Sequence, residues 1–451
     1  MKTIALASTV LLALSLVSPA TANYAKKAEE QTDYIQKNFY VASAKRYRPS
    51  FPINPKELPY DFMWGNGVQF SALVGAAQHN PAKYKQTLYD FREGLQTYWD
   101  PIAPVPGFNA YCSGPGGNDK YYDDNEWLVL GFAEAYEITR DPMFLKDAQN
   151  TQKFVLSGWD SKLGGGIYWK VDHRSKNTCS NGPAAASALR LVQVAKQADQ
   201  LEWATKIRDW TNSRLLDADG LYWDNVNLDG KIEKTKWSYN TALMIYTNVL
   251  FGQLQKDKKS LTEARRLADA GLAAWTDPAT GSLQKTEDAP RFTHLFCESL
   301  LRLYDVTKDV KYLNAVRRHA SFAYRYARDP QGGYWNKWKM VTHAPDERKI
   351  LIENASAARL FWLLAPYQDT DELLEAGKQA AGKGEDRKAE GLLRQAADSD
   401  AEAVEARYQL HNVLLCQKKT AAAAAEATIL TGFAKDPAKR KSLQALGWKA
   451  E

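Results

Sequence analysis

The stretch NGPAAASAL, at residues 181–189, has small or apolar side chains at almost every position. A helix that is exposed to water keeps polar residues along one face, whereas these residues would surround most of a helix's circumference. The stretch therefore predicts a helix that is buried on nearly all sides. Such a helix needs packed neighbours around it, so the rest of the chain must supply them.

Similar stretches recur along the chain at intervals of about 57 residues. They begin near residues 63, 123, 181, 237, 294 and 351. Between them lie stretches with one polar face, at residues 24–38, 81–99, 142–158, 199–214, 259–275 and 309–328. The sequence thus predicts six buried helices that alternate with six amphipathic helices.

The connectors between the helices repeat as well. Glycine-rich turns followed by short aromatic runs stand at residues 164–169, 219–224 and 332–335, and residues 281–283 are a weaker copy. Six helical hairpins bury the inner faces of the first and last pair only if the chain closes on itself. We therefore predict an all-α fold, an (α/α)6 toroid with the apolar helices inside. An open α-solenoid is the competing arrangement.

The N-terminus has the features of an export signal. Lys2 supplies a positive charge, residues 4–17 are apolar, and residues 20–22 (ATA) form a small-residue cleavage pattern. Cleavage near Asn23 would give a secreted or periplasmic protein. The apolar run is short for a membrane span, and no later segment approaches about 20 uninterrupted apolar residues, so no membrane span is expected.

Composition and charge exclude several classes of protein. Hydrophobic residues make up 45% and charged residues 25%, which is ordinary for a globular protein. The net charge of +6 is modest, and Lys and Arg are spread along the chain, so nucleic acid is not an expected partner. The four cysteines lack CxxC spacing, so no metal site is expected. Cys112 and Cys179 lie in loops beside the candidate site, but spacing alone leaves open whether they pair.

The composition changes after Pro366, where aromatic residues nearly vanish and Ala, Glu, Lys and Arg dominate. Helices are predicted at residues 372–382, 387–397, 401–418 and 420–433, whose lengths suggest two tetratricopeptide-like hairpins. We therefore divide the chain into a signal peptide (1–22), a toroidal catalytic domain (23–367) and an accessory helical module (368–451). The module is a candidate surface for a protein partner.

The densest cluster of reactive side chains is YYDDNEW, at residues 121–127, where the second buried helix begins. Free N–H groups and the helix dipole stabilise carboxylates at a helix N-terminus, so an acid pair there can simply cap the helix. In a ring of inner helices, however, the N-terminal ends converge on one cleft. Asp123 and Asp124 would then lie at the floor of that cleft, among aromatic side chains.

Two neighbouring carboxyl groups suit the hydrolysis of a glycoside, which needs a proton donor and either a nucleophile or a base. Consecutive helical residues diverge by about 100°, so the two groups can approach within roughly 5–6 Å. This separation favours a retaining double displacement over an inverting mechanism. Mutual repulsion would keep one of the acids protonated while the other ionises.

The acid cluster resembles the Tyr-x-Asp-Asp-x-x-Trp motif of the glycoside hydrolase family 76 endo-α-1,6-mannanases. Residues 122–127 (YDDNEW) carry the likeness, together with 176–177 (KN), 180–183 (SNGP), 238–240 (SYN) and 355–357 (ASA). The resemblance covers about residues 24–367. It implies an (α/α)6 barrel that cleaves α-mannan without a cofactor, with Asp123 as nucleophile and Asp124 as acid/base.

Two positions depart from the family pattern. Residues 241–242 are Thr-Ala where the family has Gln-Gly, and residues 292–294 are Phe-Thr-His where it has Phe-Lys-Gly. Both changes leave the acid pair intact, but they bear on the contacts with individual sugar units and therefore on the exact linkage.

Sugars present apolar C–H faces and many hydroxyls, so aromatic rings and amides are suitable binding groups. Several such residues begin the inner helices or occupy the loops before them. We predict that the substrate contacts Trp64, Asn66, Tyr122, Trp127, Asn181, Trp237, Tyr239 and Asn240. The aromatic runs of the connectors lie either beside this site or at the opposite end of the barrel, and the sequence does not distinguish the two.

Three other functions compete with α-mannan hydrolysis. A non-catalytic protein could hold glycan in the cleft and recruit a partner through the tail. An (α/α)6 hydrolase could act on another polysaccharide, such as an unsaturated uronide. A sugar 2-epimerase would need histidine bases, but neither His173 nor His294 has a fitting context, and export disfavours a metabolic epimerase.

Overall fold

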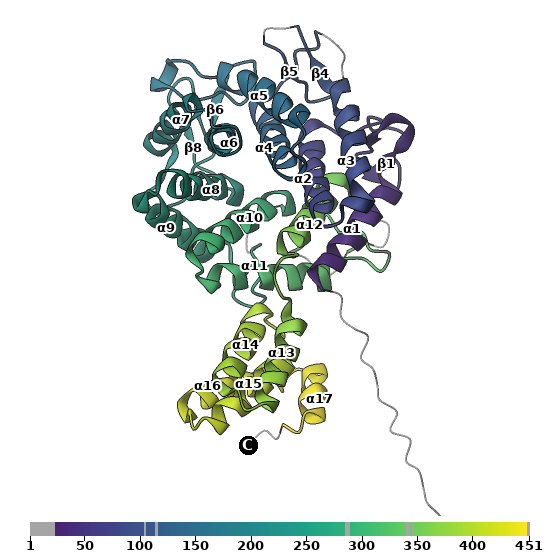
Figure 1. Ribbon diagram of the computed structural model, residues 1–451, viewed down its shortest axis with the longest axis vertical. Helices are drawn as coiled ribbons and strands as arrows, with labels where there is room; N and C mark the ends of the chain where they lie inside the picture. The colour runs from purple at the N-terminus through teal and green to yellow at the C-terminus, as the bar shows by residue number, and fades with distance from the viewer. Residues whose placement is uncertain are drawn as a thin grey trace, which may run out of the picture.

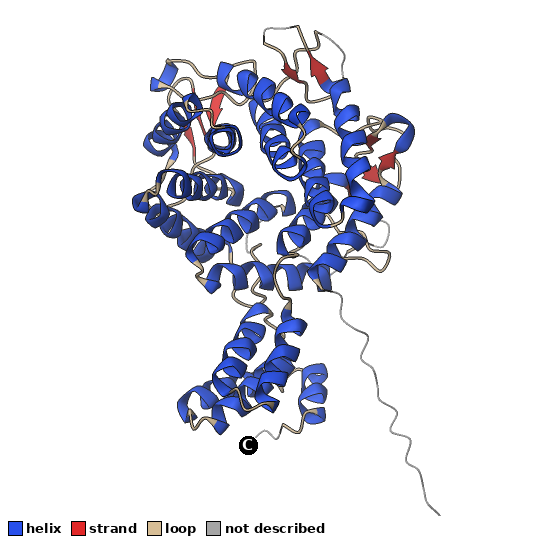
Figure 2. Cartoon of the chain, viewed as in Figure 1, coloured by secondary structure: helices blue, strands red, loops and turns tan. Residues whose placement is uncertain are grey.

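The computed structural model describes residues 23–102, 105–112, 116–284, 289–339, 343–344 and 347–448. The predicted signal peptide, residues 1–22, lies outside these ranges. Helices dominate the described chain, and the strands are short and belong to the connectors (Figure 2). Within the described residues, no helix is both long and apolar enough to cross a membrane.

Six inner helices form a ring, as the repeated apolar stretches predict (Figure 1). Each one packs on the next, and the last packs on the first. The ring is therefore closed, and the open solenoid is wrong. The inner helices are α2 (Met63–His79), α4 (Tyr122–Thr139), α6 (Thr178–Ala195), α8 (Ser238–Gln255), α10 (Pro290–Thr307) and α12 (Leu351–Leu364).

Six amphipathic helices surround the ring, and each covers an inner helix with its apolar face. They are α1 (Tyr24–Asn38), α3 (Pro81–Leu95), α5 (Pro142–Ser157), α7 (Asp199–Leu215), α9 (Lys258–Trp275) and α11 (Val310–Phe322). The prediction of an all-α (α/α)6 toroid is confirmed. Glycines allow the inner helices to approach closely: a side chain at Gly182 would come within 2.8 Å of Leu243 on the next helix.

Short antiparallel strands join the hairpins at one end of the ring. One three-stranded sheet, in the order β6-β7-β8, lies beside the inner helices, and β3 pairs with β9, which brings the two ends of the ring together. The strands are β1 (Tyr40–Val41), β2 (Arg46–Tyr47), β3 (Ser50–Phe51), β4 (Trp99–Asp100), β5 (Gly107–Phe108), β6 (Ser175–Asn177), β7 (Asn225–Asn227), β8 (Ile232–Glu233) and β9 (Lys349–Ile350).

A buried asparagine near the start of three inner helices anchors the preceding connector. Asn125, Asn181 and Asn354 each accept a hydrogen bond from one backbone N–H of the connector and donate to the carbonyl of the same residue. In α8 the hydroxyl of Thr241 accepts the backbone N–H of Tyr222 instead. The amide side chain thus satisfies backbone groups that have no strand partner, which buried polar groups require.

Charged residues fill the ring interior toward the C-terminal ends of the inner helices. The guanidinium of Arg359 pairs with Glu134 at 2.9 Å and with Glu298 at 3.0 Å, and Arg302 also binds Glu298. A small cavity of about 40 Å³ lies among these side chains, and Trp127 also lines it. The ring is therefore closed at this end by an ion network.

The C-terminal residues form a separate helical unit with its own apolar core. Its helices are α13 (Thr370–Gly382), α14 (Asp386–Ser399), α15 (Val404–Cys416), α16 (Thr420–Phe433) and α17 (Pro437–Ala445). The first four agree with the helices predicted from the sequence. The fifth, α17, was not predicted, because it is short and rich in polar residues.

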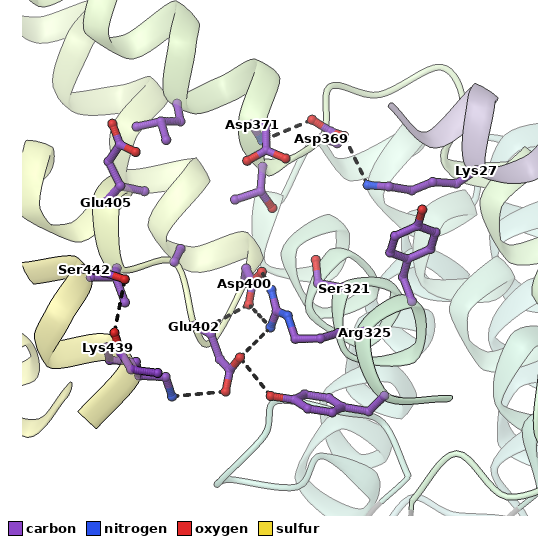
Figure 3. Close-up of a pocket in the computed structure, with 18 of the residues that line it drawn as sticks. Lys27, Ser321, Arg325, Asp369, Asp371, Asp400, Glu402, Glu405, Lys439 and Ser442 are labelled. Atoms are coloured by element: carbon purple, nitrogen blue, oxygen red, sulfur yellow. Dashed lines mark hydrogen bonds and ion pairs between the residues drawn. The ribbon is translucent and has the colours of Figure 1, made fainter. Parts of the chain in front are cut away.

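The unit packs on the outside of the toroid, chiefly through α14 against α11. Ion pairs connect the two parts: Lys27 meets Asp369 at 3.3 Å, and Arg325 meets Asp400 at 2.7 Å and Glu402 at 2.8 Å (Figure 3). Between them lies a cavity of about 1240 Å³. These contacts fix the unit against the outer helices of the toroid.

Candidate active site

The candidate site is a cavity of about 480 Å³ at the N-terminal end of the inner helices. Side chains from the first turns of five inner helices reach it, and the connectors before α4, α6 and α8 form its sides. The convergence of N-termini that the ring predicts is therefore present. Six of the predicted site residues line this cavity: Trp64, Asp123, Asp124, Trp127, Trp237 and Tyr239.

Asp123 lies in the first turn of α4 and its carboxylate accepts several hydrogen bonds. The indole Nε1 of Trp169 donates to Oδ2 at 3.0 Å, and the thiol of Cys179 lies 3.4 Å from the same oxygen. The backbone N–H of Asp124 donates to Oδ1 at 3.0 Å. Burial raises the pKa of Asp123 to about 6, and the side-chain donors partly offset this rise.

Asp124 differs from its neighbour in its electrostatic environment. Asp124 is only 7% exposed, and burial raises the pKa of its carboxyl group well above the usual value. The negative charges of Asp123 and Asp119 raise it further. Asp124 therefore keeps its proton at a pH at which Asp123 has lost its own. Two adjacent carboxyl groups with different pKa values can serve as an acid and a nucleophile.

A wall of aromatic rings flanks the acid pair. Phe292 stacks on Tyr239 with ring centroids 4.4 Å apart and on Trp64 at 5.5 Å, and Trp237 lies 5.4 Å from Phe292. The connector residue Trp169 also lines the cavity and is 40% exposed. The arrangement offers flat apolar faces of the kind that pack against sugar rings.

The structure does not bring the other four predicted residues into the cavity. Tyr122 points outward and stacks on Phe154 at 4.7 Å, and Asn181 is occupied by the backbone of the connector. Asn66 is fully buried and donates to the carbonyl of Asp61. Asn240 lies behind the cavity wall, where its amide is 3.4 Å from Asp224. These residues support the site and do not form its surface.

Several lining residues were not among the predicted ones. Trp169, Cys179, Asp224 and Phe292 all face the cavity. Burial raises the pKa of Asp224, and bonds from Asn225 and Asn240 partly offset the rise. The sequence contained a usable signal for Trp169 and Asp224: each connector leads directly into an inner helix and must therefore lie at the N-terminal end of the ring.

The connectors divide their aromatic residues between the cavity and the core. Trp169 faces the cavity, whereas its neighbour Tyr168 and the equivalent Tyr222 and Tyr334 are fully buried. The aromatic runs thus lie beside the site and not at the opposite end. Adjacent residues of an extended segment point to opposite sides, which explains the division.

His173 and His294 do not line the cavity, and Cys112 and Cys179 do not form a disulfide. His294 is buried outside the cavity lining, and burial lowers its pKa to about 4, while His173 stacks on Tyr168 at 4.1 Å. Cys112 and Cys179 are both free thiols, so the pairing that the sequence left open does not occur. Within the described residues, no three side chains of His, Cys, Asp or Glu gather as metal ligands.

Comparisons with known proteins agree with this geometry. The model of glycosyl hydrolase family 76 matches residues 24–333. A crystal structure of a family 76 α-mannanase from Bacteroides thetaiotaomicron superposes with a TM-score of 0.72 at 26% identity, over 77% of this chain and 97% of that chain.

Two curated fungal proteins are also similar. The meiotically up-regulated gene 191 protein of Schizosaccharomyces pombe is 23% identical over 320 residues, which are 63% of this chain and 71% of that protein. The mannan endo-1,6-alpha-mannosidase DCW1 of Saccharomyces cerevisiae is 29% identical over 117 residues, which are 23% of this chain and 26% of that protein.

Proposed function

Because the chain belongs to glycosyl hydrolase family 76 and is therefore a glycoside hydrolase, we propose that it cleaves α-1,6 bonds within α-mannan, with retention of configuration. One observation carries the proposal: two consecutive acids, with pKa values raised to different extents, lie in a cavity lined by aromatic rings. The α-mannanase and endo-1,6-mannosidase names of its relatives indicate the substrate.

In the proposed mechanism Asp123 is the nucleophile and Asp124 the acid/base. A carboxylate oxygen of Asp123 attacks the anomeric carbon while Asp124 transfers its proton to the glycosidic oxygen, and the bond between that carbon and oxygen breaks. Water then attacks the anomeric carbon of the resulting glycosyl ester, and Asp124 accepts a proton from the water. The bond between that carbon and Asp123 breaks, and Asp123 leaves as a carboxylate. The lower pKa of Asp123 and the higher pKa of Asp124 support this order of roles.

Neither departure from the family pattern lies on the cavity surface. Thr241 is fully buried and holds the backbone of Tyr222, so it does not line the cavity. Thr293 and His294 are also buried outside the cavity lining, whereas Phe292, which both patterns share, contributes a ring to the aromatic wall. We therefore propose that neither departure contacts the sugar units directly.

We further propose that the enzyme acts outside the cell or in the periplasm, on the basis of the export signal at residues 1–22. The toroid through residue 367 forms the catalytic domain, since α12 closes the ring. The helical module at residues 368–451 resembles tetratricopeptide hairpins in its paired helices, and we propose that it receives a protein partner at the polar cavity beside the toroid.

The test of the catalytic proposal uses linear α-1,6-mannan and measures new reducing ends over time. The wild-type protein is expected to release short oligosaccharides, and nuclear magnetic resonance of the first product is expected to show the α-anomer. Asp123→Asn and Asp124→Asn should each lower kcat by at least about 10³-fold, since each removes a group that acts in the transition state. Asp209→Asn, on the outer helix α7, is the matched control with an exposed aspartate.

Other outcomes separate the competing functions. Binding of mannan without release of reducing ends would identify a glycan-binding protein. Release from a different glycan in a panel that includes unsaturated uronides would identify another substrate. Normal turnover in both aspartate variants would contradict the catalytic assignment.

A further inference from the structure

Cys179 is the only cysteine among the described residues that lines the catalytic cavity. It occupies the first turn of α6, is 2% exposed, and its sulfur lies 3.4 Å from Oδ2 of Asp123. The same oxygen receives the indole N–H of Trp169. Two side chains from outside α4 therefore converge on one oxygen of the proposed nucleophile.

The thiol can act toward Asp123 only as a proton donor. Burial raises the pKa of Cys179 well above its ordinary value, and the charges of Asp123 and Asp224 raise it further. The group therefore stays a neutral S–H, which is a weak donor, and the ionised carboxylate has only acceptors to offer. A hydrogen bond to the charged form of an acid favours that form.

Tyr239 and Cys179 belong to the same buried apolar cluster. The phenol group partly offsets the rise in the pKa of the thiol. Tyr239 is itself 8% exposed and packed against Phe292. The thiol therefore sits among side chains from the first turns of neighbouring inner helices.

We propose that Cys179 is a positioning residue for the hydrolysis: its S–H acts with the indole N–H of Trp169 to keep Asp123 ionised and oriented toward the substrate. The inference rests on the proposed role of Asp123 as nucleophile. An ordinary buried cysteine fills space and can be replaced by a residue of similar size. Cys179 differs because its sulfur contacts a reacting group.

Other titratable groups surround Asp123 and bear on its charge as well. Asp124 and Glu126 on α4 and Tyr239 on α8 interact with Asp123 itself. Asp119, in the loop before α4, acts on Asp124, and Asp224, in the connector before α8, acts on Cys179. Most of these are acids and oppose ionisation of Asp123. The donors from Cys179 and Trp169 oppose that effect, so the loss of either donor is expected to shift Asp123 toward its protonated form.

The experiment measures kcat/KM against pH on α-1,6-mannan for the wild type and for Cys179→Ser, Cys179→Ala and Cys179→Val. The acidic limb of the kcat/KM profile, where activity falls as the pH is lowered, reports the pKa of Asp123. Loss of the donor in the Ala and Val variants should move this limb upward by about one pH unit, because a hydrogen bond to the charged form of an acid lowers the pKa of that acid by about this amount. At pH 5 the kcat/KM of these variants relative to the wild type should be roughly tenfold lower than the same ratio on the pH-independent plateau of the profile. The serine hydroxyl donates as well and should keep the limb near its wild-type position.

Cys297→Ala is the matched control, since Cys297 is also fully buried but lies in the core of α10. It should leave the limb unmoved even if it lowers the melting temperature. The side chain of Val has a volume comparable with that of Cys. Cys179→Val therefore tests the loss of the donor even if Cys179→Ala folds poorly.

Three results would overturn the inference. A uniform fall in kcat/KM with an unmoved limb in both Ala and Val variants would reduce Cys179 to a packing residue. A limb that moves in Cys179→Ser as far as in Cys179→Ala would exclude the donor role. A wild-type protein that is inactive on the mannan would overturn the proposed function and this inference with it, and is recognised before any variant is compared.

Discussion

Replacement of Arg359 by methionine tests whether the ion network at the closed end of the ring stabilises the toroid. The guanidinium is 3% exposed, donates to both oxygens of Glu134 at 3.1 and 2.9 Å, and pairs with Glu298 at 3.0 Å. It also donates to the carbonyl of Ser71 at 3.1 Å. Methionine has a similar length but no charge, so the change leaves two acids facing each other in the ring interior.

The expected loss follows from the cost of leaving a buried charge without its partner. Removal of one member of a buried ion pair typically costs 3–5 kcal/mol, so we expect about 4 kcal/mol here. An unfolding entropy of about 2.1 cal/mol/K per residue over roughly 340 residues corresponds to about 0.7 kcal/mol/K. The melting temperature of the toroid should therefore fall by about 6 °C.

The pH dependence identifies the cause of this loss. Burial alone would raise the pKa of Glu298, but Arg359 and Arg302 outweigh it and hold the pKa far below its usual value. A carboxyl group with a depressed pKa stabilises the fold above its unfolded pKa, and this contribution is lost as pH falls through the folded pKa. The difference between wild type and variant should thus be full at pH 7 and shrink below about pH 4, where protonation relieves the unpaired acids.

Thermal and urea denaturation, followed by circular dichroism between pH 3.5 and 7.5, measure this difference. Addition of Glu134→Gln and Glu298→Gln to the Arg359→Met variant removes the unpaired charges and should restore part of the stability. Arg302→Met is the matched control. Arg302 also binds Glu298, but its side chain is 27% exposed, so its replacement should cost less stability. Wild-type stability in Arg359→Met, or a loss that does not change with pH, would refute the reasoning.

Three further predictions concern residues of the site and its support. Trp169→Phe removes the donor to Asp123 but keeps an aromatic ring, so the acidic limb of the kcat/KM profile, expected near pH 6 in the wild type, should move upward; an unmoved limb would contradict the role of the indole N–H. Asn181→Ala should lower the free energy of unfolding by about 2 kcal/mol in urea titrations while KM stays at the wild-type value, since its amide binds only backbone; a raised KM with full stability would restore its predicted role as a sugar ligand. Glu126 is fully buried, and burial followed by the charges of Asp123 and Asp124 raises its pKa, so it destabilises the fold above its unfolded pKa. Glu126→Gln should therefore gain melting temperature relative to the wild type as pH rises from 4 to 8 and show no gain below about pH 4; a gain that is equal at every pH would contradict the electrostatic cause.

The sequence alone determined the plan of the toroid and the location of its acids. Side chains that are small or apolar around a whole helix can only be buried, and their recurrence every ~57 residues predicted the inner helices to within a few residues of their observed starts. The acid pair was found because Asp123 and Asp124 begin one of these helices. Both inferences depend on residues that are close in the chain, where spacing translates directly into geometry.

Only the tertiary structure decided which side chains reach the cavity and what charge they carry. Asn181 and Asn240 looked like sugar ligands because they are polar and begin inner helices, but backbone groups and Asp224 from neighbouring connectors occupy their amides. Trp169 and Cys179 meet Asp123 from 46 and 56 residues away. Such contacts arise where one repeat packs on the next, and the pKa of a buried acid depends on all of them together, so no pattern within a single repeat specifies it.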